Sequence, residues 1–401
     1  MRLPDGQPAP ADGSLPEAAL AAAGRRGFGV YVHVPFCASR CGYCDFNTYT
    51  AAELRGGVTR RTYPDLVLRE LELATRVLGA GMPKVETVFF GGGTPTLLDP
   101  DDLGRILAAI DAAFGLAADA EVTTEANPES VDLGSLRRLR AAGFTRVSLG
   151  MQSTAPHVLA VLDRRHTPGR AVEAAQEARE AGFAHVNLDL IYGTPGERPE
   201  DFAASLRAAV DAGVDHVSAY ALVVEEGTAL AARVRRGEVP APDDDVAADR
   251  YLAAEEILSA AGFSWYEISN WARSPQARCR HNLLYWTGGD WWGLGPGAHS
   301  HVGGVRWWNV THPSTYADRL AAGRSPAAAR EVLTDDQRRT EEIMLGLRLA
   351  EGLPLGRLPR PAVERALSEG LLAEAPYRSG RAVLTLRGRL LADTVTRMLL
   401  D

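Results

Sequence analysis

The chain has 401 residues, of which 46% are hydrophobic and 23% are charged, and its formal net charge is −8. This length favours one large domain with a smaller second unit. The negative charge argues against a nucleic-acid partner, which would select a basic face. No apolar stretch approaches the length of about 18 residues that a membrane-spanning helix requires, so at most a peripheral membrane contact is expected.

Residues 1–26 are predicted to form a disordered arm, because Pro8, Pro10, Gly13 and other breakers interrupt any helical pattern. The arm lacks the continuous apolar core of a signal peptide. The four cysteines, three of which lie close together, do not suggest a disulfide framework. We therefore expect a cytoplasmic protein in a reducing compartment.

From Gly27 onward, apolar strand-like runs alternate with amphipathic helical segments, as in a parallel sheet with crossover helices. The intervening Ala-rich helices end in glycines such as Gly143 and Gly182, which suit left-handed C-caps. Strands are predicted at residues 30–34, 85–90, 121–125, 146–150, 185–191 and 216–222. The sequence thus predicts an α/β fold whose main unit is a partial (β/α)6 barrel over residues 27–268.

The rest of the chain, residues 269–401, is expected to form a smaller helical or winged-helix-like domain. Before it, residues 233–246 are predicted to be a surface loop, whose Asp243–Asp245 run indicates a solvated face or a helix N-cap in preference to a metal site. An aromatic, irregular stretch covers residues 265–308. The tail beyond it is predicted to be helical, with a strand at 382–386 and a last helix at 390–400.

Cys37, Cys41 and Cys44 follow the first predicted strand with the spacing Cys-x3-Cys-x2-Cys. Three thiolates can hold three irons of a [4Fe-4S] cluster and leave the fourth iron open, whereas clusters for electron transfer usually have four cysteine ligands. An open metal position can bind a small molecule. The alternatives are buried thiols or a zinc site, which generally needs a second Cys/His pair, and the remaining cysteine, Cys279, lies far along the chain.

Polar groups and glycines also follow the next strands, where a barrel binds its ligands. The segment Gly91–Thr94 follows the second strand, and its glycines allow a close backbone approach to a ligand, although a tight turn would use them too. Glu125, Gln152 and Asp189 stand at the ends of the following strands. Together with Arg164 they suit a nucleoside that carries an amino-acid tail. Any one of them alone could be structural, but their recurrence at consecutive strand ends favours a ligand site.

These motifs resemble those of the radical SAM superfamily and, within it, of the oxygen-independent coproporphyrinogen III oxidase family. The resemblance extends from about Gly27 to the C-terminus and implies a [4Fe-4S] cluster on Cys37, Cys41 and Cys44, with S-adenosylmethionine (SAM) on the open iron. It also implies that SAM contacts Tyr31, Tyr43, Gly92, Gly93, Thr94, Glu125, Gln152, Arg164 and Asp189, with Phe46 as a wall of the same site.

Three features resemble the haem-chaperone branch of that family. The dehydrogenase members carry a cysteine where this chain has Phe46, and they have an ordered N-terminal extension where this chain has a short arm of disordered composition. The segment His281–Trp286 has the chaperone pattern His-Asn-x-x-Tyr-Trp. An imidazole can ligate haem iron and aromatic rings can stack on a porphyrin, so His281 is a candidate haem ligand. Cys279 is a second, weaker candidate. The alternative is an aromatic cluster that packs the second domain against the barrel.

The first functional hypothesis is therefore a haem chaperone, which binds haem and passes it to an acceptor haemoprotein such as a respiratory enzyme. The second is a radical SAM enzyme, either coproporphyrinogen III dehydrogenase or another porphyrin-directed activity, in which the cofactor carries the chemistry. An iron–sulfur electron carrier is a third hypothesis, which the open iron disfavours. No catalytic residue is assigned.

Overall fold

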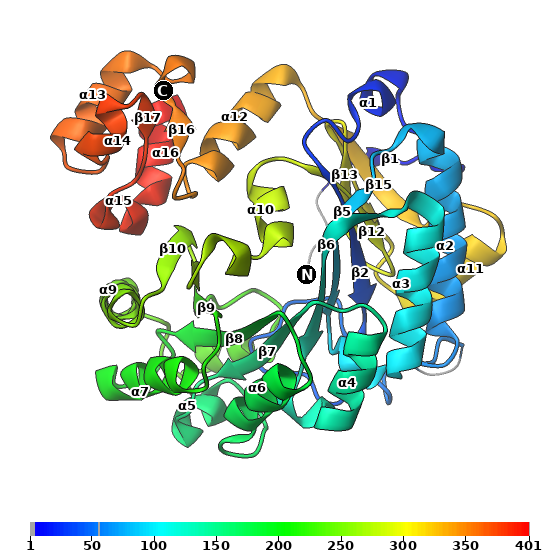
Figure 1. Ribbon diagram of the computed structural model, residues 1–401, viewed down its shortest axis with the longest axis horizontal. Helices are drawn as coiled ribbons and strands as arrows, with labels where there is room; N and C mark the ends of the chain where they lie inside the picture. The colour runs from blue at the N-terminus through cyan, green and yellow to red at the C-terminus, as the bar shows by residue number, and fades with distance from the viewer. Residues whose placement is uncertain (1–4, 55–56, 401) are drawn as a thin grey trace.

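The computed structural model describes residues 5–54 and 57–400 (Figure 1). At its centre, neighbouring parallel strands curl into a partial barrel. These strands are β2 (Phe28–Val34), β5 (Val85–Gly92), β6 (Leu116–Ala126), β7 (Arg146–Gln152), β8 (His185–Tyr192) and β9 (His216–Ala221). All six strands predicted from the sequence are confirmed, with differences only at their ends.

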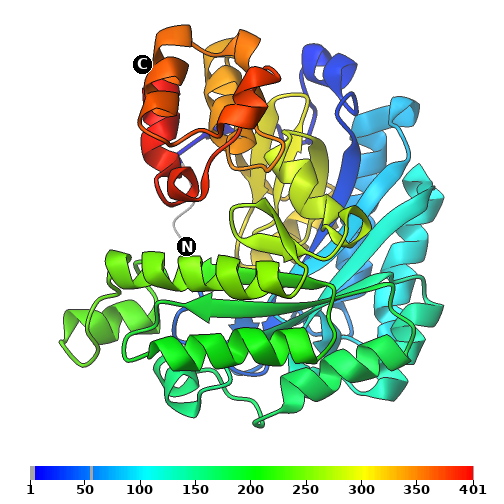
Figure 2. The same cartoon turned by 60° about the vertical axis from the view of Figure 1, so that its left-hand side comes forward.

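Helices cover the outer face of these strands (Figures 1 and 2). The longer ones are α2 (Tyr63–Leu78), α3 (Pro100–Phe114), α4 (Leu133–Ala141), α6 (Arg170–Glu180), α7 (Pro199–Asp211) and α9 (Asp244–Ala260), and the shorter ones are α5 (Pro156–Val161) and α8 (Ala229–Arg235). Gly143 and Gly182 have φ of +107° and +89°, as the C-cap prediction requires. Asp243 accepts hydrogen bonds from the amides of Asp245 and Val246, so it caps α9 as predicted. Within the described residues, no helix is both long enough and apolar enough to cross a membrane.

The barrel strands place apolar side chains outward and polar side chains inward, because successive residues of a strand face opposite sides. In β6, Glu121, Thr123 and Glu125 share one face, and in β8 Asn187 and Asp189 do so. The alternate positions belong to the apolar core under the helices, namely Val122, Val147, Leu149, Val186, Leu188 and Leu190. The barrel interior is therefore polar.

The sheet continues past the six predicted strands at both edges. On one side, β12 (Asp290–Leu294) pairs in parallel with β2, and β13 (His299–Val302), β14 (Val305–Asn309) and β15 (Ala327–Val332) follow in antiparallel order. On the other, β11 (Asn270–Ala272) and β10 (Ser264–Glu267) extend β9. The sheet does not end at the domain boundary predicted at residue 268. The pairing of β12 with β2 joins segments that are far apart in the sequence, so no local sequence pattern indicates it.

The expectation of a disordered arm is wrong for residues 5–26. The strand β1 (Gln7–Pro8) pairs antiparallel with β15, and α1 (Glu17–Ala22) lies against β13. A Cβ on Gly303 would come within 2.0 Å of the Ala19 carbonyl oxygen, so the arm lies directly on the β13–β14 turn. Pro8 is tolerated because β1 is an edge strand, where a missing N–H costs no ladder hydrogen bond.

The C-terminal residues form a separate unit above the barrel (Figure 2). It contains α12 (Asp335–Gly346), α13 (Arg360–Ser368), α14 (Glu374–Arg378), α15 (Leu386–Leu390) and α16 (Ala392–Leu400). It has an apolar core of its own, which includes Ile343, Leu347, Val363 and Val395. The strands β16 (Leu353–Pro354) and β17 (Arg381–Ala382) pair within it, and α11 (Pro313–Ala321) lies back on the barrel side. The helical tail is as predicted, but the strand expected at 382–386 is confined to β17.

A buried ion pair between Glu121 and Arg146 ties the barrel to the short helix α10 (Arg280–Trp286). The Glu121 carboxylate accepts from Arg146 Nε and from the amides of Arg280 and His281, each at 3.1 Å. Arg146 Nη2 donates to the carbonyl oxygens of Ala277 and Arg278, at 2.5 and 3.0 Å. The pair thus fixes the chain that enters α10, and its carboxylate lies at the helix N-terminus, where negative charge is favoured.

We expect Glu121→Gln to lower the free energy of unfolding by about 3 kcal/mol, because it leaves the buried Arg146 charge without a partner. Urea denaturation followed by circular dichroism measures this loss. The matched control is Glu180→Gln, whose pair with Arg137 is 60% exposed and whose loss should cost less than about 0.5 kcal/mol. Equal stabilities for the two variants would contradict the role given to the buried pair.

Candidate functional site

A cavity of about 400 Å³ opens at the carboxyl ends of the barrel strands, and this size is typical of small-molecule sites. The cysteine loop that follows β2 forms one side, and the ends of β5 to β9 form the rest. Nearly all of the site residues predicted from the sequence line it, namely Cys37, Cys41, Tyr43, Cys44, Phe46, Gly92, Gly93, Thr94, Glu125, Gln152, Arg164 and Asp189. Residues that are distant in the chain are thereby brought to one place.

The three cysteines are free thiols on this loop, which begins with β3 (Phe36–Cys37) paired to β4 (Tyr49–Thr50). Burial raises the pKa of the Cys37 thiol and raises that of Cys44 to about 11, so a metal must displace protons when it binds. In the part of the chain that the structure describes, no three His, Cys, Asp or Glu side chains are close enough to share one metal ion. A cubane cluster has separate irons for its thiolates, and the three thiols of this loop could each serve one iron.

The glycine loop after β5 packs directly beneath the cysteine loop. The amide of Gly93 donates to Val34 O at 2.8 Å, and that of Thr94 donates to Phe36 O at 2.7 Å. A Cβ on Gly93 would lie 2.4 Å from Phe36 O and 3.1 Å from Cys37 Sγ. A larger residue would therefore push the two loops apart, which is why glycine is needed here beyond any contact with a ligand.

Asn47 fixes the cysteine loop from the other side. Its Nδ2 donates to the carbonyl oxygens of Pro296 and Thr311, at 2.9 and 2.8 Å, and its own carbonyl oxygen bonds to His33 Nε2 at 2.8 Å. Pro296 and Thr311 flank the β13–β14 hairpin. The shape of the cysteine loop thus depends on a segment that the sequence analysis had assigned to a second domain.

Two half-buried carboxyl groups, those of Glu125 and Asp189, form the floor of the cavity. Asp189 accepts hydrogen bonds from Ser148 Oγ and Asn187 Nδ2, both at 2.8 Å, and Glu125 accepts one from the amide of Gly92 at 3.1 Å. Burial raises the pKa of both groups, and together with the nearby Asp189 it brings that of Glu125 to about 8. Such a pair is suited to a cationic ligand, which would favour the ionised carboxylates.

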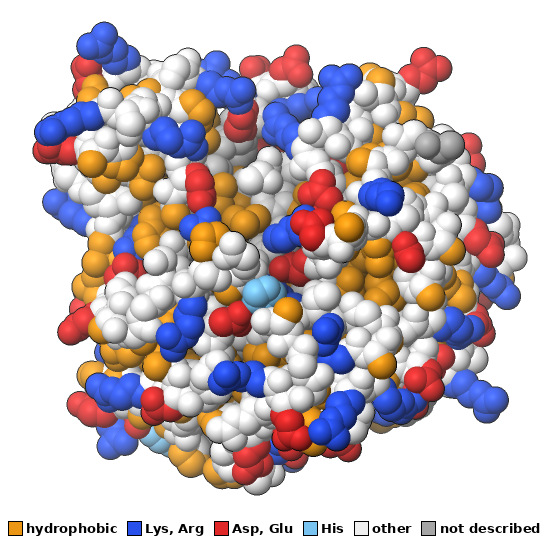
Figure 3. Space-filling view, viewed as in Figure 1, with side chains coloured by type: hydrophobic (Ala, Val, Ile, Leu, Met, Phe, Trp, Pro, Cys, Tyr) orange, Lys and Arg blue, Asp and Glu red, His pale blue; other side chains and the backbone are white. Residues whose placement is uncertain are grey.

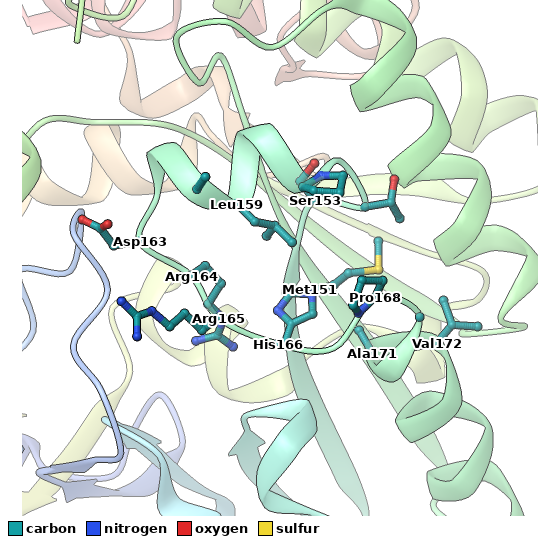
Figure 4. A pocket seen from close by; sticks show the side chains of 14 residues that line it. Met151, Ser153, Leu159, Asp163, Arg164, Arg165, His166, Pro168, Ala171 and Val172 are labelled. Atoms are coloured by element: carbon teal, nitrogen blue, oxygen red, sulfur yellow. The ribbon is translucent and has the colours of Figure 1, made fainter. Parts of the chain in front are cut away.

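Arg164 lies on the loop between α5 and α6 (Figure 4). Its Nη2 donates to Gly150 O at 2.8 Å and its Nη1 lies 3.5 Å from Cys41 Sγ, so it joins the fourth barrel strand to the cysteine loop. Gln152 and Asp163 adopt left-handed backbones, with φ of +66° and +50°. Strain of this kind gathers at functional sites. The same loop bounds a second hollow of about 390 Å³, which Met151, Leu159, His166, Pro168 and Val172 help to line.

Tyr31 and His281 lie outside the cavity lining, deeper in the barrel. Tyr31 bonds through its hydroxyl to His33 Nδ1 at 3.0 Å. His281 is fully buried, with Nδ1 bonded to Thr87 Oγ1 at 2.8 Å and Nε2 to the Tyr285 hydroxyl at 2.7 Å. Burial lowers the pKa of His281 to about 3, so the ring is neutral. With both nitrogens engaged, His281 offers no lone pair to an iron, which favours the packing alternative.

Cys279, the second candidate haem ligand, is also buried. Its Sγ lies 3.5 Å from a carboxylate oxygen of Glu121, and burial raises the pKa of the thiol far above its usual range. Cys279 belongs to the segment that the Glu121–Arg146 pair holds, so it has a packing role, as His281 does.

The sequence analysis overlooked several residues around the cavity. Ser148 and Asn187 hold Asp189 from within the barrel. Tyr220 and Val223, like Phe46, are exposed hydrophobic side chains of the cavity lining. The sequence does contain a sign of the interior residues, because polar and apolar residues alternate along the strands. This alternation, with its period of two, distinguishes the residues that face the barrel interior from those of the apolar core.

Comparison with known proteins agrees with this geometry. Residues 31–209 match the sequence profile of the radical SAM superfamily. The chain is 60% identical to "Heme chaperone HemW" of Mycobacterium tuberculosis over 375 residues, which cover 93% of this chain and 95% of that protein. It is 36% identical to mouse "Radical S-adenosyl methionine domain-containing protein 1, mitochondrial" over 342 residues, 85% of this chain and 72% of that protein.

Among solved structures, coproporphyrinogen III oxidase (HemN) from Escherichia coli superposes with a TM-score of 0.79. The match covers 95% of this chain and 92% of that one at 24% sequence identity. At this level of identity the likeness shows a shared fold.

We expect His281→Ala to lower the free energy of unfolding by about 3 kcal/mol, because the change empties a buried site and leaves Thr87 and Tyr285 without partners. Chemical denaturation measures it, with His157→Ala as the control, since His157 is 48% exposed. If both variants unfold at the same denaturant concentration, the packing role of His281 is wrong.

Proposed function

We propose, because the chain belongs to the HemW family of the radical SAM superfamily, that it is a haem chaperone, which binds haem and transfers it to an acceptor haemoprotein. The observation that carries the proposal is 60% identity across 95% of a haem chaperone. The acceptor we infer is a haemoprotein such as a respiratory enzyme, loaded from the cytoplasm. Phe46, in place of the cysteine of dehydrogenases, supports the chaperone over the enzyme.

The same proposal assigns a [4Fe-4S] cluster to Cys37, Cys41 and Cys44, with SAM on the open iron. In support, the three thiols share one cavity with the groups that SAM requires. Glu125 and Asp189 are the acceptors for its ammonium and hydroxyl groups, and Arg164 is the donor for its carboxylate. Further contacts are assigned to Tyr43, Gly92, Gly93, Thr94 and Gln152, with Phe46 at the rim. Tyr31 is assigned an indirect role, because it lies outside the cavity lining and deeper in the barrel.

When bound, a reduced cluster supplies the electron that cleaves SAM in radical chemistry. The cysteine loop would hold this group, and the glycine loop and Asn47 fix the loop in place. Arg164 Nη1 lies 3.5 Å from Cys41 Sγ, so its positive charge faces this ligand position. These residues position the cofactor whether or not SAM is turned over.

Anaerobic reconstitution of the full chain tests the proposal. We expect uptake of a [4Fe-4S] cluster, binding of haem in a spectroscopic titration, and no conversion of coproporphyrinogen III in the presence of SAM and a reductant. Cys41→Ser should lose the cluster and Cys279→Ser should keep it, because Cys41 lines the cavity whereas Cys279 is buried outside it. Formation of protoporphyrinogen by the wild type would replace the chaperone with the dehydrogenase.

The affinity for SAM should rise with pH up to about 8, the pKa of Glu125. Below that pH the carboxyl group is neutral, so a cationic ligand has to displace its proton. In this range the dissociation constant should fall by up to about tenfold for each unit by which the pH rises. Calorimetry of cluster-loaded protein from pH 6 to 9 measures this, and two buffers of different ionisation enthalpy count the released proton. Glu125→Gln should flatten the profile, whereas Glu225→Gln at the exposed mouth should retain it. A flat wild-type profile refutes the assignment.

A further inference from the structure

A third cavity, of about 590 Å³, lies between the barrel sheet and the C-terminal unit and shares no lining residue with the cavity at the cysteines. Figure 3 shows the molecule hollowed between that unit and the rest of this face. Its walls come from the N-terminal arm, the end of α10, β13 and α12. Four parts of the chain therefore meet around a space large enough for a sizeable ligand.

His301 projects into this cavity with one ring nitrogen held and the other free. Its Nδ1 lies 2.9 Å from Gly289 O and 3.3 Å from Asp290 Oδ1, and Nε2 bonds to none of the residues that the structure describes. Asp290 is itself fixed by the amides of Gly24 and Gly303, at 2.7 and 2.8 Å. A carbonyl and a carboxylate on Nδ1 keep the proton there and leave the Nε2 lone pair free, as metal-ligating histidines require.

The cavity also carries cations without anionic partners. Arg25, Arg26, Arg338 and Arg381 line it, and none of them forms an ion pair with a carboxylate of the described residues. The glutamates along its edge are already paired, Glu341 with Arg306, Glu342 with Arg357 and Glu351 with Arg278. Arg25 and Arg381 donate to backbone carbonyl oxygens, whereas the side chains of Arg26 and Arg338 form no hydrogen bond with the described residues. These two guanidinium groups suit a ligand that bears carboxylates.

Apolar side chains complete the walls of the cavity. Leu283 and Trp286 of α10 face it, as do Leu345 and Leu349 beyond them. Trp286 lies five residues after His281, so the helix turns His281 and Tyr285 into the barrel and presents Trp286 to the cavity. A flat aromatic ligand would find a ring to stack on here and not at His281.

We propose that this cavity is the haem site, with His301 Nε2 as the axial ligand of the iron and with Arg26 and Arg338 pairing with the propionates. The inference rests on the proposed function, since it places the cargo of the chaperone. Within the His-Asn-x-x-Tyr-Trp segment, the residue that contacts haem is then Trp286 and not His281.

Haem titrations of the full-length protein, followed by absorption and electron paramagnetic resonance, test the ligand. His301→Ala should bind haem at least tenfold more weakly and lose the histidine–iron signature, and added imidazole should restore it. His157→Ala, on the surface, should behave as the wild type. If the wild type fails to bind haem, the proposed function is wrong; if the wild type binds and His301→Ala binds equally well with the same spectrum, only the site is wrong.

The propionate contacts have an independent test, because Arg26 and Arg338 are exposed and their loss should leave the fold intact. The Arg26→Gln/Arg338→Gln variant should bind haem about tenfold more weakly than the wild type. Haem dimethyl ester, in which the propionates are neutral, should bind equally well to both proteins. Arg137→Gln/Arg360→Gln, at two exposed arginines outside the cavity, is the matched control. Equal affinity of wild type and variant for haem refutes the arginine contacts.

Discussion

The buried pair of Glu121 and Arg146 holds α10 against the barrel strands, and the cavity of His301 takes part of its wall from that helix. A helix of seven residues has little stability of its own. Burying two charges costs solvation, and the cost is offset only when further hydrogen bonds satisfy them. Here the bonds go to the amides and carbonyls of the segment that enters α10, so the pair places this segment as well as stabilising it.

α10 presents different side chains to its two sides. His281 and Tyr285 lie toward the barrel, and Leu283 and Trp286 line the cavity of His301. A row of aromatic rings runs from the barrel side to that cavity, from His281 to Tyr285 at 4.7 Å, on to Trp291 at 4.5 Å and on to His301 at 5.4 Å. The helix and these rings therefore form one packed wall of the cavity of His301.

The six barrel strands and the cysteine cavity could be predicted from the sequence, because both depend on local patterns. A buried parallel strand is an apolar run, and the groups at its carboxyl end follow it directly in the chain. The pairing of β12 with β2 could not be predicted, since each strand is completed by a partner far away in the sequence. The arm was misjudged for the same reason, because its short strand depends on the free edge of β15.

The comparison of His281 with His301 shows most clearly what a sequence motif cannot predict. His281 stands in a recognisable pattern, yet it is buried with both nitrogens bonded. His301 belongs to no pattern and is distinguished only by what its Nδ1 contacts. A motif identifies a segment that matters, whereas the availability of a lone pair is decided by the packing around it.

The anchoring of Asn47 by Pro296 and Thr311 has a consequence for synthesis of the protein. Thr311 follows Asn47 by 264 residues, so at about 5–20 residues per second the ribosome needs roughly 13–50 s to deliver it. During that interval the cysteines are translated but their loop is not held in place. The loop can therefore reach its anchored form only after most of the chain has emerged.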